Sequence, residues 1–202
     1  MSPAGALLLV AAALAATGAK DPGEHLVAGA NAFRDARYDQ ALVEFRVAES
    51  LGAKEARGYR AATLVQLGRF DDAVEAFGAE ADGDALLAYY HAIACYEARL
   101  YGCADRLLAS VGTRSGPGVA ERAARTREAI AAELAREPPQ ASIDWYLQTC
   151  SQQRGAGRPV LALAFCREAV GLAERRADRY RHAEAASQVA ALTGPGRPGP
   201  AP

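Results

Sequence analysis

Cysteine is the residue type in this sequence best suited to covalent chemistry. The chain holds four cysteines, Cys95, Cys103, Cys150 and Cys166. An even number of cysteines in an exported chain favours disulfides, and four cysteines allow three pairings. The alternative is that all four are free thiols buried at small-residue positions, which cysteine fills well. Because the sequence has no CxxC or HxxxH spacing, we predict no metal site.

The other residue types that perform catalysis are isolated from one another. The three histidines, His25, His91 and His182, lie far apart and have no partner at a catalytic spacing. The glycine turn RGAGR, residues 154–158, lacks the lysine and the serine or threonine of a phosphate-binding loop. We therefore predict no catalytic residue and no cofactor, and we expect that the protein is not an enzyme.

The composition indicates that helices must position these residues. Half of the 202 residues are hydrophobic, and alanine dominates this set. Alanine is the best helix former and lets helices pack closely. No segment alternates apolar and polar residues as a strand would. The formal net charge is -1, from 23 basic and 24 acidic residues, which excludes the basic excess typical of a nucleic-acid-binding surface.

The N-terminal segment has the layout of a secretory signal. Residues 1–19 carry no charged side chain, and residues 6–16 read ALLLVAAALAA. Small residues follow before Lys20 opens the polar chain. This layout predicts a signal peptide over residues 1–19 and a periplasmic or secreted protein. The alternative is an uncleaved membrane anchor, because the apolar stretch is at the short limit for a membrane span. That anchor would be the chain's contact with a membrane.

Nine residues recur along the middle of the chain. RYDQALVEF covers residues 37–45, RFDDAVEAF covers residues 69–77, and a weaker copy, LYGCADRLL, covers residues 100–108. The predicted helices form pairs over residues 22–36 and 38–51, 54–67 and 70–81, and 84–99 and 101–111. The loops between them are short, so neighbouring helices must lie antiparallel. A single hairpin leaves an apolar face uncovered, and the hairpins must therefore stack.

The paired helices resemble the tetratricopeptide repeat family, of the exported bacterial type. That family's unit is a helix–turn–helix of 34 residues, and Ala41, Ala73 and Ala104 here are 32 and 31 residues apart. The family's other small and large positions are Gly29, Ala61 and Ala92, Tyr38, Phe70 and Tyr101, and Phe45, Phe77 and Leu108. The resemblance implies an all-α fold, a right-handed solenoid of antiparallel helix hairpins, with about three clear repeats over residues 20–111.

The regular spacing of the predicted helix pairs ends after the third pair. Residues 112–118, GTRSGPG, predict a flexible linker, and residues 119–192 predict additional helices. The last residues, 193–202, are rich in glycine and proline and predict a disordered tail. Repeat positions recur with poorer residues at Tyr146, Cys150, Ala162, Cys166 and Ala169. They imply a degenerate hairpin over residues 143–172.

Two helix pairings are possible in this C-terminal part. If residues 143–172 form a hairpin, the helix over residues 119–136 stands alone between the repeats. Strict alternation would instead pair that helix with the helix over residues 141–154. We favour the first register, because it keeps the small and large residues at the repeat's spacing.

The resemblance also selects one cysteine pairing. It places Cys95 and Cys103 on the two helices of the third hairpin, close to their shared turn. It places Cys150 and Cys166 on the two helices of the degenerate hairpin. It therefore implies the disulfides Cys95–Cys103 and Cys150–Cys166, each stabilising the fold by roughly 2–3 kcal/mol in the loop-entropy model.

The resemblance further implies a peptide-binding groove, because in this family the first helix of each hairpin lines a concave surface. The positions are Leu26, Ala30, Phe33, Arg34, Ala62, Val65, Gln66, Tyr89, Ile93, Tyr96 and Glu97. This set is mainly apolar and aromatic, which favours an apolar peptide or an amphipathic helix. We expect an exported scaffold or adaptor that binds a protein or peptide. The alternatives are a structural spacer or assembly subunit of an envelope complex with no open groove, and an enzyme with an unrecognised site.

Overall fold

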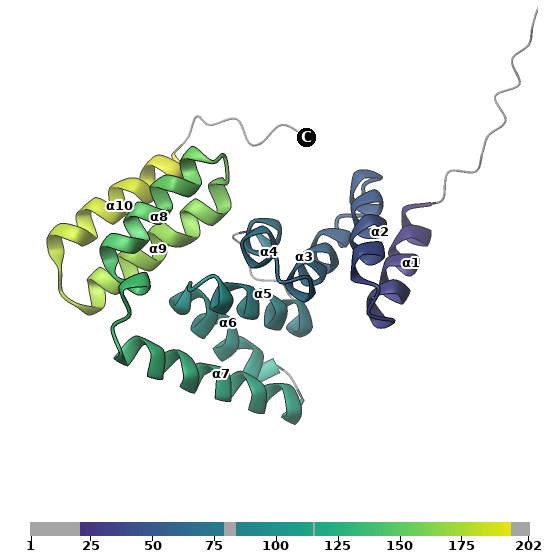
Figure 1. Ribbon diagram of the computed structural model, residues 1–202, viewed down its shortest axis with the longest axis horizontal. Coiled ribbons are helices and arrows are strands. Elements are labelled where there is room, and N and C mark those ends of the chain that lie inside the picture. The colour runs from purple at the N-terminus through teal and green to yellow at the C-terminus, as the bar shows by residue number, and fades with distance from the viewer. Residues whose placement is uncertain (1–20, 79–83, 115, 195–202) are drawn as a thin grey trace, which may run out of the picture.

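The computed structural model describes residues 21–78, 84–114 and 116–194 (Figure 1). Within these ranges every regular element is a helix and no strand is present, which confirms the all-α class. The elements are α1 (Pro22–Arg34), α2 (Tyr38–Ser50), α3 (Ala56–Gln66), α4 (Phe70–Phe77), α5 (Ala85–Glu97), α6 (Tyr101–Arg114), α7 (Pro117–Ala135), the 3-10 turn η1 (Pro139–Ala141), α8 (Ile143–Gly155), α9 (Pro159–Arg175) and α10 (Arg179–Thr193). Among the described residues no helix is long and apolar enough to span a membrane.

The two predicted terminal segments lie wholly or mostly outside these ranges. The signal peptide predicted over residues 1–19 lies outside the described residues, as does most of the tail predicted over residues 193–202. Thr193 is an exception, because it is the last residue of α10. The first helix begins where the sequence predicts it: Asp21 accepts a hydrogen bond from the Gly23 N–H, and Pro22 takes the first helical position.

One tight turn recurs between paired helices. Between α1 and α2 the Arg37 N–H donates to the Ala32 carbonyl at 2.8 Å, and Ala36 takes a left-handed backbone with a φ of 58°. The same backbone bond closes α3–α4, α5–α6 and α8–α9, where the left-handed residues are Gly68, Arg99 and Gly157. This motif satisfies the last carbonyls of the first helix and leads directly into the second. The same bond also closes α2–α3 and α9–α10, at Gly52 and Ala177, so six connections share one turn geometry.

Small residues allow the helices of the first three hairpins to touch. Gly29 of α1 lies against the ring of Phe45 in α2, and a Cβ added at Gly29 would come within 2.7 Å of that ring. The alanines predicted at helix contacts are 0% exposed, namely Ala41, Ala61, Ala73, Ala92 and Ala104. From α1 to α6 each helix packs on the next, and α3 also packs on α5. The hairpins thus stack in chain order.

The linker predicted over residues 112–118 is largely helical, which corrects that expectation. Helix α6 continues to Arg114 and α7 begins at Pro117. Proline fits the first turn of a helix because its missing N–H would have no partner there. Helix α7 packs on α6, and its buried residues are Ala123 and Ile130.

The last three helices form a layer of their own, which we call the C-terminal layer (α8–α10). Helix α9 lies at its centre and packs on both α8 and α10. Of the two predicted pairings, the structure therefore has the hairpin over residues 143–172, and α7 packs on α6 outside this hairpin. Helix α9 also packs on α4 and α6, so the C-terminal layer returns to the second and third hairpins (Figure 1).

Carboxylates at helix starts fix this return contact. Glu75 of α4 accepts hydrogen bonds from backbone N–H groups at the start of α9, the shorter being 2.7 Å from Leu161. In the opposite direction, Glu168 of α9 accepts hydrogen bonds at the start of α6, 2.8 Å from the Gly102 N–H and 2.6 Å from the Cys103 N–H. The unpaired N–H groups and the dipole of a helix N-terminus both favour a carboxylate there.

Candidate functional site

The residues predicted to line a groove fall into different environments. Phe33, Tyr89, Ile93 and Tyr96 are half-buried, and Arg34 and Gln66 are exposed. Val65 is only 8% exposed and belongs to the main core, so it offers no surface to a partner, which corrects its prediction. Leu26 packs inward against buried residues of α1 and α2 and the start of α3. Stacked helices bury more than one face, so Val65 lies in the core, and Leu26 is half-buried against its neighbours.

Several of the predicted residues meet on one face. The ring of Phe33 in α1 lies edge-on to Tyr38 in α2 and to Tyr90 in α5, with centroid distances of 5.5 and 6.0 Å. The Gln66 side-chain amide of α3 donates to the Tyr90 hydroxyl at 3.2 Å. Tyr89 lies 6.3 Å from Tyr90. We call these five residues the aromatic face; it brings together α1, α2, α3 and α5.

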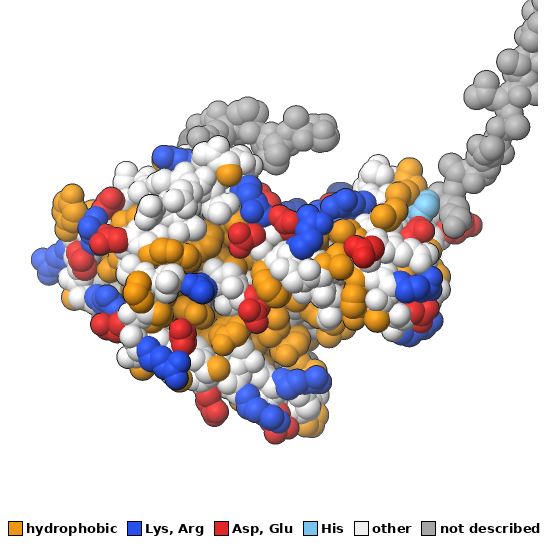
Figure 2. Space-filling model, in the orientation of Figure 1, with side chains coloured by type: hydrophobic (Ala, Val, Ile, Leu, Met, Phe, Trp, Pro, Cys, Tyr) orange, Lys and Arg blue, Asp and Glu red, His pale blue; other side chains and the backbone are white. Residues whose placement is uncertain are grey.

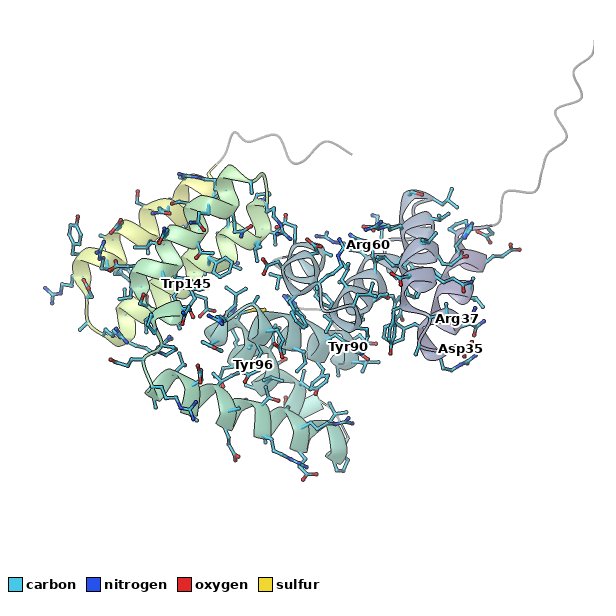
Figure 3. All side chains as sticks on the ribbon, in the orientation of Figure 1. Asp35, Arg37, Arg60, Tyr90, Tyr96 and Trp145 are labelled. Carbon is cyan, nitrogen blue, oxygen red and sulfur yellow. A yellow bond between two sulfur atoms is a disulfide. The ribbon has the colours of Figure 1, made fainter. Side chains whose placement is uncertain are left out.

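Tyr38 and Tyr90 belong to this face although the sequence did not predict them as groove residues. The repeat pattern places Tyr38 at a packing position that opens a second helix, and it places Tyr89, but not its neighbour Tyr90, in the groove. Tyr89 and Tyr90 are consecutive residues of α5, and both side chains reach this surface. Figure 3 shows Tyr90 towards the α1–α2 turn that carries Asp35 and Arg37.

Tyr96 belongs to a different part of the surface from the aromatic face. Its ring packs edge-on against Tyr101 at a centroid distance of 6.0 Å, near the turn between α5 and α6. Figure 3 shows Tyr96 on the side of the molecule that faces α7 and the C-terminal layer, away from Tyr90. Of the predicted groove residues, Phe33, Gln66 and Tyr89 therefore lie in one cluster of contacts with Tyr38 and Tyr90, and Tyr96 contacts Tyr101 instead.

A polar cavity of about 150 Å³ lies where α4, α5, α6 and α9 meet. Its polar lining includes His91, Cys103, Arg106, Glu168 and Arg175. Val74, Leu107 and Ala164 are among its apolar lining residues. Residues far apart in the sequence are brought together here because α9 returns to the earlier hairpins.

His91 is buried in this cavity wall, with 5% of its surface exposed. Its ring stacks on Phe77 at a centroid distance of 4.6 Å, and its Nδ1 atom has no hydrogen-bond partner among the described residues. Burial, and then the nearby Arg106 charge, lower the pKa of His91 to about 4. The imidazole is therefore neutral near pH 7, with one ring nitrogen carrying a proton and the other a free lone pair.

Glu168 is the buried carboxylate of the cavity. Burial raises its pKa, while the hydrogen bonds from the Gly102 and Cys103 N–H groups and the charges of Arg106 and Arg175 act in the opposite direction. A Cβ added at Gly102 would lie 2.9 Å from a Glu168 oxygen, so glycine is needed for this close approach. Glu168 is thus fully engaged with the start of α6.

Both disulfides expected from the repeat pattern are present. Cys95 and Cys103 join α5 to α6 with a Cα–Cα distance of 6.0 Å, and Cys150 and Cys166 join α8 to α9 with a distance of 5.4 Å. Both distances lie in the usual range for a disulfide. The ligand atoms of His91, Cys95 and Cys103 lie within 4.8 Å of one another. This cluster was missed because His91 and Cys95 have an HxxxC spacing.

A charged groove of about 450 Å³ runs over α2, α3, α4 and the start of α9. Its charged residues are Arg46, Glu49, Arg57, Arg60, Arg69, Asp72, Glu75 and Arg158. Figure 2 shows blue and red side chains side by side along this edge of the molecule. Arg60 pairs with Glu49 and Arg69 with Asp72, each at 2.6 Å, so much of the charge is neutralised within the groove.

Comparisons with known proteins assign no family to this chain. No family model matches it, and neither the curated proteins nor the solved structures give a significant match. The function must therefore be inferred from the geometry of the chain itself, above all from the aromatic face and the two disulfides.

Proposed function

We propose that the chain is an exported, tetratricopeptide-like scaffold that binds an extended segment of another polypeptide and performs no catalysis. The observation that carries this proposal is the contact of half-buried rings from α1 and α5, Phe33 and Tyr90, beside α3. Aromatic residues at a surface are typical of binding interfaces, because their rings bury a large apolar area and their polar atoms remain hydrated.

The mixture of groups on the aromatic face favours an extended peptide over a bound helix. The face combines rings with the hydroxyls of Tyr89 and Tyr90 and the amide of Gln66. An extended peptide exposes its backbone N–H and C=O groups, which can pair with these polar atoms while its side chains pack on the rings. A helix satisfies its own backbone groups and would leave the remaining hydrogen-bonding capacity of these polar atoms unused.

The packing of the later helices supports an accessible face. Helix α7 packs on α6, and α9 packs on α4, α6, α8 and α10. The aromatic face lies on α1, α2, α3 and α5, so it is separate from these contacts. The rival proposal, a structural spacer whose groove is filled by its own chain, would be favoured by a helix lying over Phe33 and Tyr90.

The disulfides support the export part of the proposal. Disulfides form and persist in oxidising compartments and are rare in the cytosol. Two of them in a chain whose first 19 residues carry no charged side chain are consistent with a periplasmic or secreted protein. The partner polypeptide would be met in the same compartment.

The test is selection of linear peptides from a display library by the full disulfide-bonded chain. The selected peptide is then titrated against wild type and against a Tyr89→Ala/Tyr90→Ala variant, by calorimetry or fluorescence anisotropy. Each ring truncation removes apolar contact area worth about 1–3 kcal/mol, so we expect the double variant to bind at least about tenfold more weakly. Far-UV circular dichroism and thermal melting show whether the variant remains folded.

Tyr180→Ala is the matched control, because Tyr180 is 77% exposed on α10 and far along the chain from the aromatic face. It should leave peptide affinity unchanged. A Tyr90→Phe variant retains the ring and removes the hydroxyl, so it reports the polar contribution alone. Equal affinity of wild type and the Tyr89→Ala/Tyr90→Ala variant would refute the binding surface. Failure to select any peptide would favour the structural spacer.

A further inference from the structure

Three potential metal ligands converge beside the polar cavity. His91 and Cys95 lie one turn apart on α5, and Cys103 lies in the first turn of α6. Their ligand atoms, a ring nitrogen and two sulfurs, lie within 4.8 Å of one another. The Nδ1 atom of His91 is buried without a hydrogen-bond partner among the described residues, which is uncommon for a buried polar atom.

We propose that the chain, once the Cys95–Cys103 disulfide is reduced, binds one zinc-like divalent cation through His91 and the two thiolates. Neutral imidazole and thiolate are the ligands that zinc prefers. This inference is independent of the proposed peptide binding, because it uses other residues and a different chemical state of the protein.

The geometry suits a tetrahedral centre with one open position. At Zn–S distances of about 2.3 Å, two thiolate sulfurs of a tetrahedral site lie about 3.8 Å apart. The Cα atoms of Cys95 and Cys103 are 6.0 Å apart, so once the S–S bond is broken the site requires the two sulfurs to part to that distance by side-chain rotation. The cavity lined by His91 and Cys103 provides room for a water as the fourth ligand. Three protein ligands and one water are the arrangement of an exchangeable or reactive zinc site.

The redox step that opens the site is a thiol–disulfide exchange with a dithiol. The dithiol attacks the S–S bond, supplies two electrons and two protons, and leaves as its own disulfide. Cys103 lines the cavity, so its sulfur is the accessible one. The two new thiols then release their protons as the cation binds both sulfurs as thiolates. The reverse exchange with another disulfide restores Cys95–Cys103 and releases the cation.

The test uses the full chain, reduced with a phosphine that does not compete for the metal, and Co(II) as the probe. Cobalt occupies the same tetrahedral thiolate sites and reports them by sulfur-to-metal charge-transfer absorption. We expect one equivalent of Co(II) to bind the reduced chain, Zn(II) to displace it, and the oxidised chain to show no such band. X-ray absorption of the zinc-loaded chain should give two sulfur ligands and one nitrogen from histidine.

Variants separate this site from the other cysteines. His91→Leu and Cys103→Ala should each weaken Co(II) binding more than about tenfold, since even changes beyond the direct ligands cost 10–100-fold. A Cys150→Ala/Cys166→Ala variant should retain the band. Loss of the band in that double variant alone, its persistence in His91→Leu, or its absence from the reduced wild type would overturn the proposal. Circular dichroism identifies variants that fail to fold, and the X-ray absorption ligand count needs no variant.

Discussion

Tyr146 connects α8 to the turn between α5 and α6. It is 1% exposed, and its hydroxyl donates to the Arg99 carbonyl at 2.7 Å. Arg99 is the residue that takes the left-handed backbone in that turn, with a φ of 63°. Burial, followed by the charge of Glu168, raises the pKa of Tyr146 well above its ordinary value of 10.0. A single hydroxyl therefore ties the C-terminal layer to the third hairpin in its neutral form.

Changing Tyr146 to phenylalanine should have opposite effects at neutral and alkaline pH. Near pH 7 the variant loses a buried hydrogen bond, and we expect its free energy of unfolding to fall by about 1 kcal/mol. The folded pKa is raised, so the hydrogen bond's stabilisation is fully present below about pH 10 and is lost as the pH rises above it. There the wild type loses about 1.4 kcal/mol per pH unit relative to the variant.

Urea unfolding of both proteins between about pH 7 and pH 11 measures this difference. All other titrating groups are shared, so their contributions cancel in the comparison. The two stability curves should cross near pH 11. A difference that stays constant over this range would show that the Tyr146 hydroxyl ionises as readily in the folded state as in the unfolded state.

The roles of some single residues could be predicted from the sequence, and the roles of others could not, for a physical reason. The pairing of the cysteines followed from their places on paired helices. His91 and Glu168 could not be found in the same way, because each has a partner distant in the sequence. Both lie against Cys103, which is 12 residues from His91 and 65 residues from Glu168. Only the return of α9 to α4 and α6 brings them into one cavity. A search for HxxxC spacing would have found the helical half of the His91 cluster.

The paired helices depend on a small residue facing a large one. Gly29 in α1 lies against Phe45 in α2, as the spacing in the sequence predicted. The same reasoning placed the buried alanines of α2 to α6 correctly, because packing between neighbouring hairpins is local in sequence. It failed for residues 112–118, where three glycines and a proline suggested a loop. A proline in the first turn of a helix and a glycine near a helix end are both tolerated.

Gly29→Ala should destabilise the first hairpin even though alanine favours helix. The added Cβ would lie 2.7 Å from the Phe45 ring, so the ring must move from its buried position. We expect the free energy of unfolding to fall by about 1–3 kcal/mol, the usual effect of overpacking. Thermal or urea unfolding measures the change.

Gly112→Ala is the matched control, because Gly112 lies in α6 and an added Cβ there would meet nothing within 4 Å. Because the added Cβ meets no clash, the free energy of unfolding of Gly112→Ala should rise by about 0.5–1 kcal/mol, from the higher helix propensity of alanine. Combining Gly29→Ala with Phe45→Leu should recover part of the loss, since the smaller side chain vacates the contact. If Gly29→Ala stabilises the protein as much as Gly112→Ala does, the two helices are not in tight contact.

The molecule as a whole is held in shape by contacts that cross between its first six helices and the C-terminal layer. Glu75 and Glu168 each accept hydrogen bonds at the start of a helix from the other part. Arg158, just before α9, adds ion pairs to Asp71 and Asp72 of α4. None of these contacts was predictable from the sequence, because a repeat pattern specifies only neighbouring hairpins.

Removing both carboxylates should separate the C-terminal layer from the rest while leaving each part folded. In a Glu75→Ala/Glu168→Ala variant, the first N–H groups of α6 and α9 lose their acceptors, at a cost of about 1–3 kcal/mol for each side chain. The Cys150–Cys166 disulfide still joins α8 to α9, so that hairpin stays intact. We expect a nearly unchanged far-UV circular dichroism spectrum, a larger radius of gyration by small-angle X-ray scattering, and faster amide exchange at Gly102, Cys103 and Leu161.

Glu174→Ala tests whether loss of any carboxylate on α9 has this effect. Glu174 is exposed, and its carboxylate pairs with a surface histidine, His182, at 3.2 Å. Surface ion pairs contribute about 0–1 kcal/mol, so neither the scattering curve nor the exchange at the starts of α6 and α9 should change. An unaltered radius of gyration in the double variant would mean that apolar packing of α9 on α4 and α6 holds the layers together. The polar cavity, which those same helices enclose, would then persist without its buried carboxylate.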